Sequence, residues 1–132
     1  MNIKNSKALR TMLFISGLIA AGVGGAILSV PVAFYAAYGI EIGSNISLLN
    51  EIRAPGGALL ASGMFIMSGA FVARLTATSA VVSALLYVPY GLSRILSMAI
   101  DGMPDEGLVQ AAVLETAIGL IWVFSLVKYR ES

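Results

Sequence analysis

Residues 75–127, LTATSAVVSALLYVPYGLSRILSMAIDGMPDEGLVQAAVLETAIGLIWVFSLV, decide the fold. Two long apolar stretches, at about 75–100 and 108–127, flank a short acidic segment. Each stretch has close to the roughly 20 residues that a helix needs to cross about 30 Å of hydrocarbon. The joining segment is rich in Gly, Pro and Asp, which indicates a tight exposed turn. The two helices are therefore predicted to be antiparallel neighbours in a membrane.

Two further apolar stretches, at about 12–30 and 55–73, raise the number of predicted spans to four. The first is longer than the apolar core of a signal peptide, so we expect it to remain as an anchor. The second is expected to start near Pro55, because proline fits the first turn of a helix. The sequence thus predicts an all-α, four-transmembrane-helix bundle with antiparallel up-down neighbours, forming one integral membrane domain over residues 1–132.

Composition agrees with a membrane protein and excludes several classes of function. Hydrophobic residues make up 58% of the chain and charged residues 11%, whereas soluble domains carry about 25% charged residues. The chain has no Cys and no His, so Cys/His metal sites, thiolate nucleophiles and imidazole acid/base groups are excluded, and we expect no metal or cofactor. A net charge of +1 without a basic, aromatic cluster predicts no nucleic-acid partner.

The charges at the ends of the spans predict how the chain is oriented. If both termini share one side, the residues there are Lys4, Lys7, Arg10, Arg74, Lys128 and Arg130. The other side then carries Glu41, Glu51, Asp101, Asp105 and Glu106 together with Arg53. Since Lys and Arg accumulate in cytoplasmic loops, both termini are predicted to be cytoplasmic.

Small residues recur at four-residue spacing and predict close helix packing. Because lipid gives helices little hydrophobic reason to associate, small residues must line their contacts. The predicted stripes are Gly17, Ala21, Gly25 and Ser29 in the first span; Ala54, Ala58 and Ser62, and also Gly57 and Ala61, in the second; and Ala111, Glu115 and Gly119 in the fourth. We expect these stripes to serve packing rather than ligand binding.

Two charges inside the last two spans, Arg94 and Glu115, indicate a site. A charge at the centre of a bilayer costs roughly 2.5–3.5 kcal/mol on insertion scales, so it usually faces a bundle interior and has a partner. Both residues lie about equally far from the turn that joins their helices, so they are predicted to contact each other. Tyr87, Tyr90 and Asp101 share a helical face with Arg94, and Glu51, Arg53 and Asp101 are predicted to ring the mouth above the pair.

Two interpretations of the pair stay open. It can be a buried ion pair that only fixes helix register, or it can serve a ligand or a proton. For Tyr87 and Tyr90 the simpler interpretation is an aromatic core. For Glu51 and Arg53 it is an exposed pair of little energetic value, and for Asp101 it is a solvated loop.

The chain resembles a family of small four-span bacterial membrane proteins described only as a domain of unknown function. The residues that carry the resemblance are Glu51-Ile52-Arg53-Ala54, Gly56-Gly57, Gly91-Leu92-Ser93-Arg94, Asp101-Gly102-Met103-Pro104 and Glu115. The resemblance implies a bacterial cell inner membrane location. More distantly, the layout is similar to DoxX-like four-helix proteins and to the sterol-isomerase and sigma-receptor type of bundle, which hold hydrophobic amines or sterols against buried carboxylates.

Three classes of function follow, and binding is favoured over catalysis. The first is a binding or accessory membrane protein that holds a small amphiphile or lipid-like molecule in an outer-half cavity. Its predicted ligand-binding residues are Arg94, Glu115, Tyr87, Tyr90, Asp101, Glu51 and Arg53. The alternatives are a small proton- or solute-coupled transporter, in which a second copy of the chain could supply further helices, and an isomerase-like membrane enzyme that uses a buried carboxylate.

Overall fold

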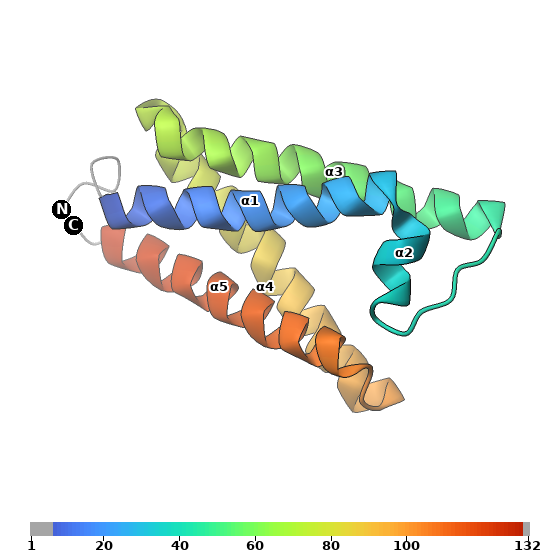
Figure 1. The fold of residues 1–132 in the computed structure, drawn as a ribbon. Coiled ribbons are helices and arrows are strands. Elements are labelled where there is room, and N and C mark those ends of the chain that lie inside the picture. The colour runs from blue at the N-terminus through green and yellow to red at the C-terminus, as the bar shows by residue number, and fades with distance from the viewer. Residues whose placement is uncertain (1–6, 131–132) are drawn as a thin grey trace.

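The computed structural model describes residues 7–130, and every regular element in that range is a helix. In chain order these are α1 (Lys7–Ser29), α2 (Pro31–Ala36), α3 (Ile46–Phe71), the short 3-10 helix η2 (Ala73–Leu75), α4 (Thr76–Asp101) and α5 (Glu106–Arg130). In the described part of the chain, four helices are long and apolar enough to cross a membrane. α1 begins and α5 ends at the same end of the bundle (Figure 1). The predicted all-α, four-span architecture is confirmed.

The start of α3 differs from the prediction. The helix begins at Ile46, well before Pro55, which lies inside it. Asn45 caps this start, because its side-chain oxygen accepts a hydrogen bond from the backbone N–H of Leu48 at 3.1 Å. A capping side chain satisfies one of the backbone donors that a helix start leaves free. Placing the helix start near Pro55 was therefore wrong, because the cap at Asn45 fixes the start of the helix and α3 runs on through the proline.

Glycines bring α1 and α3 into backbone contact. A Cβ atom on Gly63 would lie 2.3 Å from the backbone nitrogen of Ala21, and one on Gly24 would lie 2.4 Å from that of Leu60. The contacting faces are thus Gly17, Ala21 and Gly24 on α1 and Gly56 and Gly63 on α3. The predicted stripe on α1 was right at Gly17 and Ala21 and wrong at Gly25, which has open space around it.

The stripes that were predicted on α3 do not form the contact. Ala54, Ala58 and Ala61 are exposed, and Gly57 reaches only a side-chain atom of Leu28 at 4.0 Å. Instead, Gly56 and Gly63, which are seven residues apart, lie on the face of α3 that contacts α1. Several small-residue stripes coexist on this helix, and four-residue spacing alone does not distinguish the one that faces its neighbour.

α4 and α5 form the second closely packed pair. A Cβ atom on Gly91 would lie 2.9 Å from the Cα atom of Thr116, and one on Gly119 would lie 2.9 Å from the backbone nitrogen of Val88. The prediction that Gly119 lines a packing face is confirmed. Pro89 lies inside α4, which continues past it as one helix.

The two helix pairs meet at one end and separate toward the other (Figure 1). The narrow end lies near the start of α1 and the end of α5, and a buried cluster of Leu9, Leu13, Ile66, Ala80, Ala84 and Trp122 fills it. Trp122 is fully buried, and its indole N–H donates to the hydroxyl of Ser16 at 3.0 Å. At the wide end, α2 turns from the end of α1 toward the side on which α5 lies (Figure 1). The fold therefore has a closed end and an open end.

Candidate functional site

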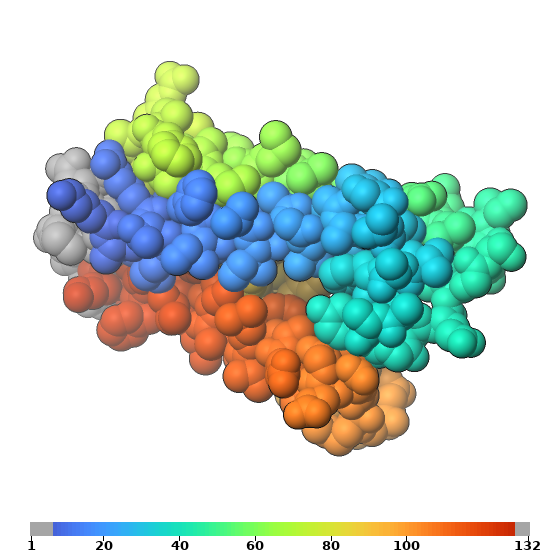
Figure 2. Space-filling model, viewed as in Figure 1, coloured from blue at the N-terminus to red at the C-terminus, as the bar shows by residue number. Residues whose placement is uncertain are grey.

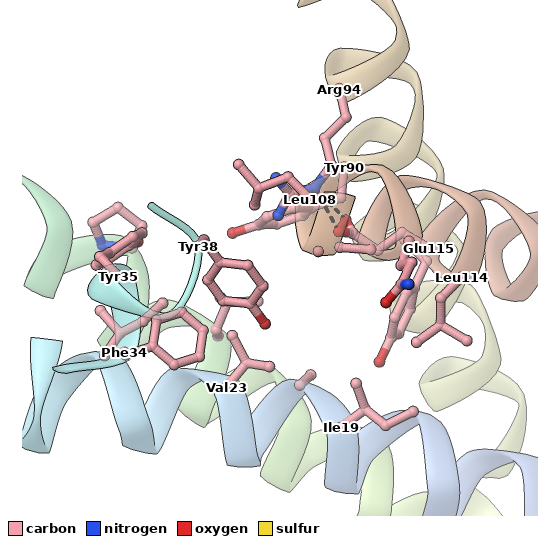
Figure 3. Close-up of a pocket in the computed structure, with 18 of the residues that line it drawn as sticks. Ile19, Val23, Phe34, Tyr35, Tyr38, Tyr90, Arg94, Leu108, Leu114 and Glu115 are labelled. Atoms are coloured by element: carbon pink, nitrogen blue, oxygen red, sulfur yellow. Dashed lines mark hydrogen bonds and ion pairs between the residues drawn. The ribbon is translucent and has the colours of Figure 1, made fainter. Parts of the chain in front are cut away.

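A cavity of about 450 Å³ lies between the two helix pairs toward the wide end. Its lining comes from α1, α2, α3, α4 and α5 and is mostly apolar (Figure 3). The apolar side chains include Ile19, Val23 and Ile27 of α1, Leu59 of α3, Leu86 of α4 and Leu108 and Leu114 of α5. The polar side chains are Tyr35, Tyr38, Tyr87, Tyr90, Arg94, Gln110 and Glu115. Tyr90, Arg94 and Glu115 belong to a wall formed by α4 and α5, whereas Tyr35 and Tyr38 enter from α2 and the residues that follow it (Figure 3).

Arg94 and Glu115 form an ion pair in this wall, which confirms the predicted contact (Figure 3). The Nε atom of Arg94 donates to both carboxylate oxygens of Glu115, at 2.6 and 3.0 Å. The Glu115 side chain is 13% exposed, whereas that of Arg94 is 32% exposed. Among the side chains that the structure describes, this is the only ion pair. The Glu115 side chain is thus the more deeply buried of the two, and the Arg94 side chain stays partly accessible.

The close approach of α4 and α5 explains why the two charges meet. Gly91 contacts the backbone of Thr116. Gly91 lies about one helical turn before Arg94 on α4, and Thr116 directly follows Glu115 on α5. A side chain larger than hydrogen at position 91 would separate the helices. The glycine that allows tight packing therefore also sets the pair at one depth.

Tyr87 and Tyr90 both line the cavity, but they are bonded differently. Tyr87 is 4% exposed, and its hydroxyl donates to the backbone oxygen of Ser16. Tyr90 is half-buried, and its ring centroid lies 6.0 Å from the guanidinium carbon of Arg94. Tyr87 thus ties α4 to α1, whereas the Tyr90 hydroxyl makes no hydrogen bond within residues 7–130.

Glu51, Arg53 and Asp101 do not line the cavity, so the predicted charged ring at its mouth does not form. Glu51 and Arg53 are exposed on α3, and the Nε atom of Arg53 donates to the backbone oxygen of Leu28 at 3.2 Å. Asp101 ends α4 and accepts a hydrogen bond from the hydroxyl of Ser97 at 3.1 Å. The early start of α3 at Ile46 and the separation of the helix pairs place these charges outside the chamber.

Sequence reasoning missed the aromatic residues that follow α1. Phe34 and Tyr35 of α2, and Tyr38 just after it, are not among the predicted site residues, yet all three line the cavity. The Phe34 ring stacks edge-on against Tyr35 and Tyr38 at centroid distances of 5.3 and 5.4 Å. Gly39, with a φ of 75°, ends the segment in a turn. Pro31, directly after the span, was the available signal for a second short helix.

Tyr38 points into the space between α1 and the ion pair (Figure 3). Its ring also covers the first turn of α5, since a Cβ atom on Gly107 would lie 2.8 Å from the ring. Burial raises the pKa of the Tyr35 hydroxyl above its ordinary value of 10.0, and the positive charge of Arg94 opposes that rise. The Tyr35 hydroxyl is therefore un-ionised at neutral pH.

Metal binding has no structural support in the described part of the chain. No group of three or more His, Cys, Asp or Glu side chains gathers within residues 7–130. The one carboxylate of the cavity already accepts two hydrogen bonds from Arg94. The wall can therefore offer hydrogen-bonding groups to a bound molecule.

The chain matches a known protein family. The model of the family described as "Domain of unknown function (DUF4345)" matches residues 8–126. The chain belongs to the DUF4345 family. No curated protein and no solved structure matches it.

The predicted resemblance to a family of unknown function is thus confirmed, and the match spans all four long helices of this DUF4345 protein. Both Arg94 and Glu115 lie inside the matched range. The bacterial origin and the likeness to DoxX-like proteins stay predictions.

Proposed function

We propose that this protein is a multi-pass membrane protein that binds a small amphiphilic molecule in the cavity between its helix pairs. The observation that carries the proposal is the chamber itself: a mostly apolar space of about 450 Å³ that contains the Arg94–Glu115 pair and a few further polar side chains. Binding sites for small molecules are typically concave, mostly apolar and about 300–1,000 Å³ in volume, with a few polar groups that orient the ligand.

The route into the chamber supports a ligand that comes from the membrane. α1 packs mainly on α3, and α5 packs mainly on α4. Between α1 and α5 the surface is hollowed, and atoms of α4 are visible at the bottom of the hollow (Figure 2). Both helices carry exposed apolar side chains such as Leu18, Leu114 and Leu120. An opening between two lipid-facing helices admits molecules dissolved in the bilayer.

The placement of the chamber in the membrane follows from the charges, as part of the same proposal. Lys7, Arg10, Arg74 and Lys128 lie at the narrow end, while Asp101, Asp105 and Glu106 lie at the wide end. Two of the charges used in the prediction, Lys4 and the Arg130 side chain, lie outside the described residues. The positive-inside rule then favours cytoplasmic termini in a bacterial inner membrane, with the wide end on the opposite face.

Transport and isomerase-like catalysis remain predictions from the sequence. At the narrow end the chamber is bounded by Tyr87, whose hydroxyl is bonded to α1, and beyond it by the buried Trp122. The carboxylate that an isomerase needs as an acid or base is held by Arg94. These contacts favour binding as the function to test first.

The test compares two tryptophan variants, one that fills the chamber and one that places the same side chain on the exposed surface of α5. Val23→Trp places an indole in the cavity, whereas Val123→Trp places one on α5 at a side chain that is 41% exposed. Each purified protein is analysed by native mass spectrometry and lipid extraction for co-purifying amphiphiles. We expect the amount of amphiphile that co-purifies with Val23→Trp to be at least tenfold lower than with the unmodified protein, and the amount that co-purifies with Val123→Trp to be unchanged. Equal retention by both variants rules the chamber out as the binding site.

A further inference from the structure

The hydrogen-bonding groups of the cavity wall are mostly donors. A guanidinium carries five N–H donors and no acceptor. Arg94 uses its Nε for Glu115, and its two terminal nitrogens make no hydrogen bond within the described residues. The hydroxyls of Tyr35, Tyr38 and Tyr90 also have no partner there. Hydroxyl groups and the Gln110 amide can each donate and accept. The cavity therefore has more free hydrogen-bond donors than acceptors, because Arg94 adds donors only.

The wall is also electrically balanced. Arg94 and Glu115 carry opposite charges and contact each other at 2.6 Å. An anionic head would leave the chamber with a net negative charge, and a cationic head would leave it positive. An uncompensated charge in an apolar environment is costly. An amine could reach Glu115 only by displacing Arg94 from it, which would strand the guanidinium.

Resting on the proposed function, we infer that the ligand is a neutral molecule whose head presents a carbonyl oxygen. Ketones, quinones and carboxylic esters share this chemistry. The carbonyl oxygen accepts from the terminal nitrogens of Arg94, with Tyr35 and Tyr90 as neighbouring donors. The apolar body lies against Ile19, Val23 and Leu59, which line the opposite side of the chamber. This assignment separates the cavity from pockets that hold amines on free carboxylates.

A matched set of probes tests the inference. A methyl ketone, a sulfonate and a primary amine on the same decyl chain differ only in their heads. Their affinities for the full chain in detergent are measured by native mass spectrometry at neutral pH, where the sulfonate and the amine are charged. We expect the ketone to bind at least tenfold more tightly than either charged probe. Tighter binding of the amine or the sulfonate overturns the assignment of the head group.

Variants then locate the contact. Arg94→Lys keeps a positive partner for Glu115 but removes the fork of two terminal nitrogens, and we expect about a tenfold loss of ketone affinity. Tyr90→Phe and Tyr35→Phe should each cost about threefold. Arg53→Lys is the matched control, because Arg53 lies outside the cavity, and it should bind the ketone as the unmodified protein does. If Arg94→Lys does not fold, the ranking of probes on the unmodified protein and the tyrosine variants decide.

The two proposals fail in different ways. If all three probes bind the Val23→Trp variant as they bind the unmodified protein, the cavity is not their site, and the proposed function fails. If binding depends on Val23 but the amine or the sulfonate binds best, only the carbonyl assignment is wrong. If Arg94→Lys and Arg53→Lys reduce ketone affinity equally, Arg94 is not the contact, and the assignment fails.

Discussion

The narrow end and the wide end of the bundle treat buried polar groups in opposite ways. At the narrow end the indole N–H of Trp122 donates to Ser16, the hydroxyl of Thr76 donates to the backbone oxygen of Gly69 at 2.7 Å, and that of Ser79 donates to Phe65 at 3.2 Å. The exceptions there are the hydroxyl of Ser83 and the Nε of Arg10, which are buried without a hydrogen-bond partner among the described residues. At the wide end, Arg94 and three tyrosines hold donors toward an open chamber.

This difference separates side chains that assemble the bundle from side chains available to a ligand. Membrane helices gain little from hydrophobic association and depend on close packing and hydrogen bonds between helices. The narrow end provides both. A wall of free donors in the same bundle contributes nothing comparable to assembly, so its groups are free to interact with something else.

The largest expected effect is the loss of stability when Trp122→Ala removes the side chain that fills the narrow end. Trp122 is fully buried, and truncating a buried tryptophan costs about 3–5 kcal/mol, because a cavity is left behind. The free energy of unfolding is measured by denaturant titration in detergent micelles. Phe124→Ala is the control on the same helix, since Phe124 is 69% exposed, and we expect a change below about 0.5 kcal/mol. Equal losses for the two variants would mean that the narrow end does not anchor the bundle.

The next effect concerns the ion pair and decides between its structural and functional interpretations. Glu115→Leu leaves Arg94 without its partner, and removing a hydrogen bond to a charged group costs about 1.5–3 kcal/mol. The double variant Arg94→Met, Glu115→Leu removes both charges, and replacing a buried pair by apolar side chains is often neutral. We expect the double variant to recover most of the stability while still failing to retain amphiphile. Recovery of both stability and binding would show that the pair only fixes helix register.

Sequence reasoning reached the Arg94–Glu115 contact because two rules act locally. A short turn makes consecutive helices antiparallel, and equal distance from that turn gives equal depth. Sequence reasoning did not predict the shape of the cavity. That shape depends on how far the two helix pairs separate, and no local sequence rule determines their separation. Gly56 and Gly63 determine the α1–α3 contact, although other small residues on α3 have an equally good spacing.

The charged ring expected at the mouth shows the same limit. Glu51 and Arg53 were placed there because Pro55 was taken as the start of the helix, whereas Asn45 caps the helix upstream. Once the helix starts at Ile46, these charges lie on its exposed side, away from the chamber. One misplaced helix start thus moved two candidate residues. The aromatic segment after α1 was missed because a short helix has too few residues to show a pattern.

The smallest expected effect lies at the boundary between the two ends, where the same substitution at neighbouring tyrosines should differ. The Tyr87 hydroxyl donates to Ser16, whose side chain accepts from Trp122, so Tyr87→Phe should lower the free energy of unfolding by about 0.6–1.7 kcal/mol. Tyr90 lies one turn further along α4 and has no such partner, so Tyr90→Phe should leave stability within about 0.5 kcal/mol and lower only ketone affinity. Both are measured by the same denaturant titration. If Tyr90→Phe destabilises the protein as much as Tyr87→Phe, the Tyr90 hydroxyl serves assembly, and the division between the ends does not hold on α4.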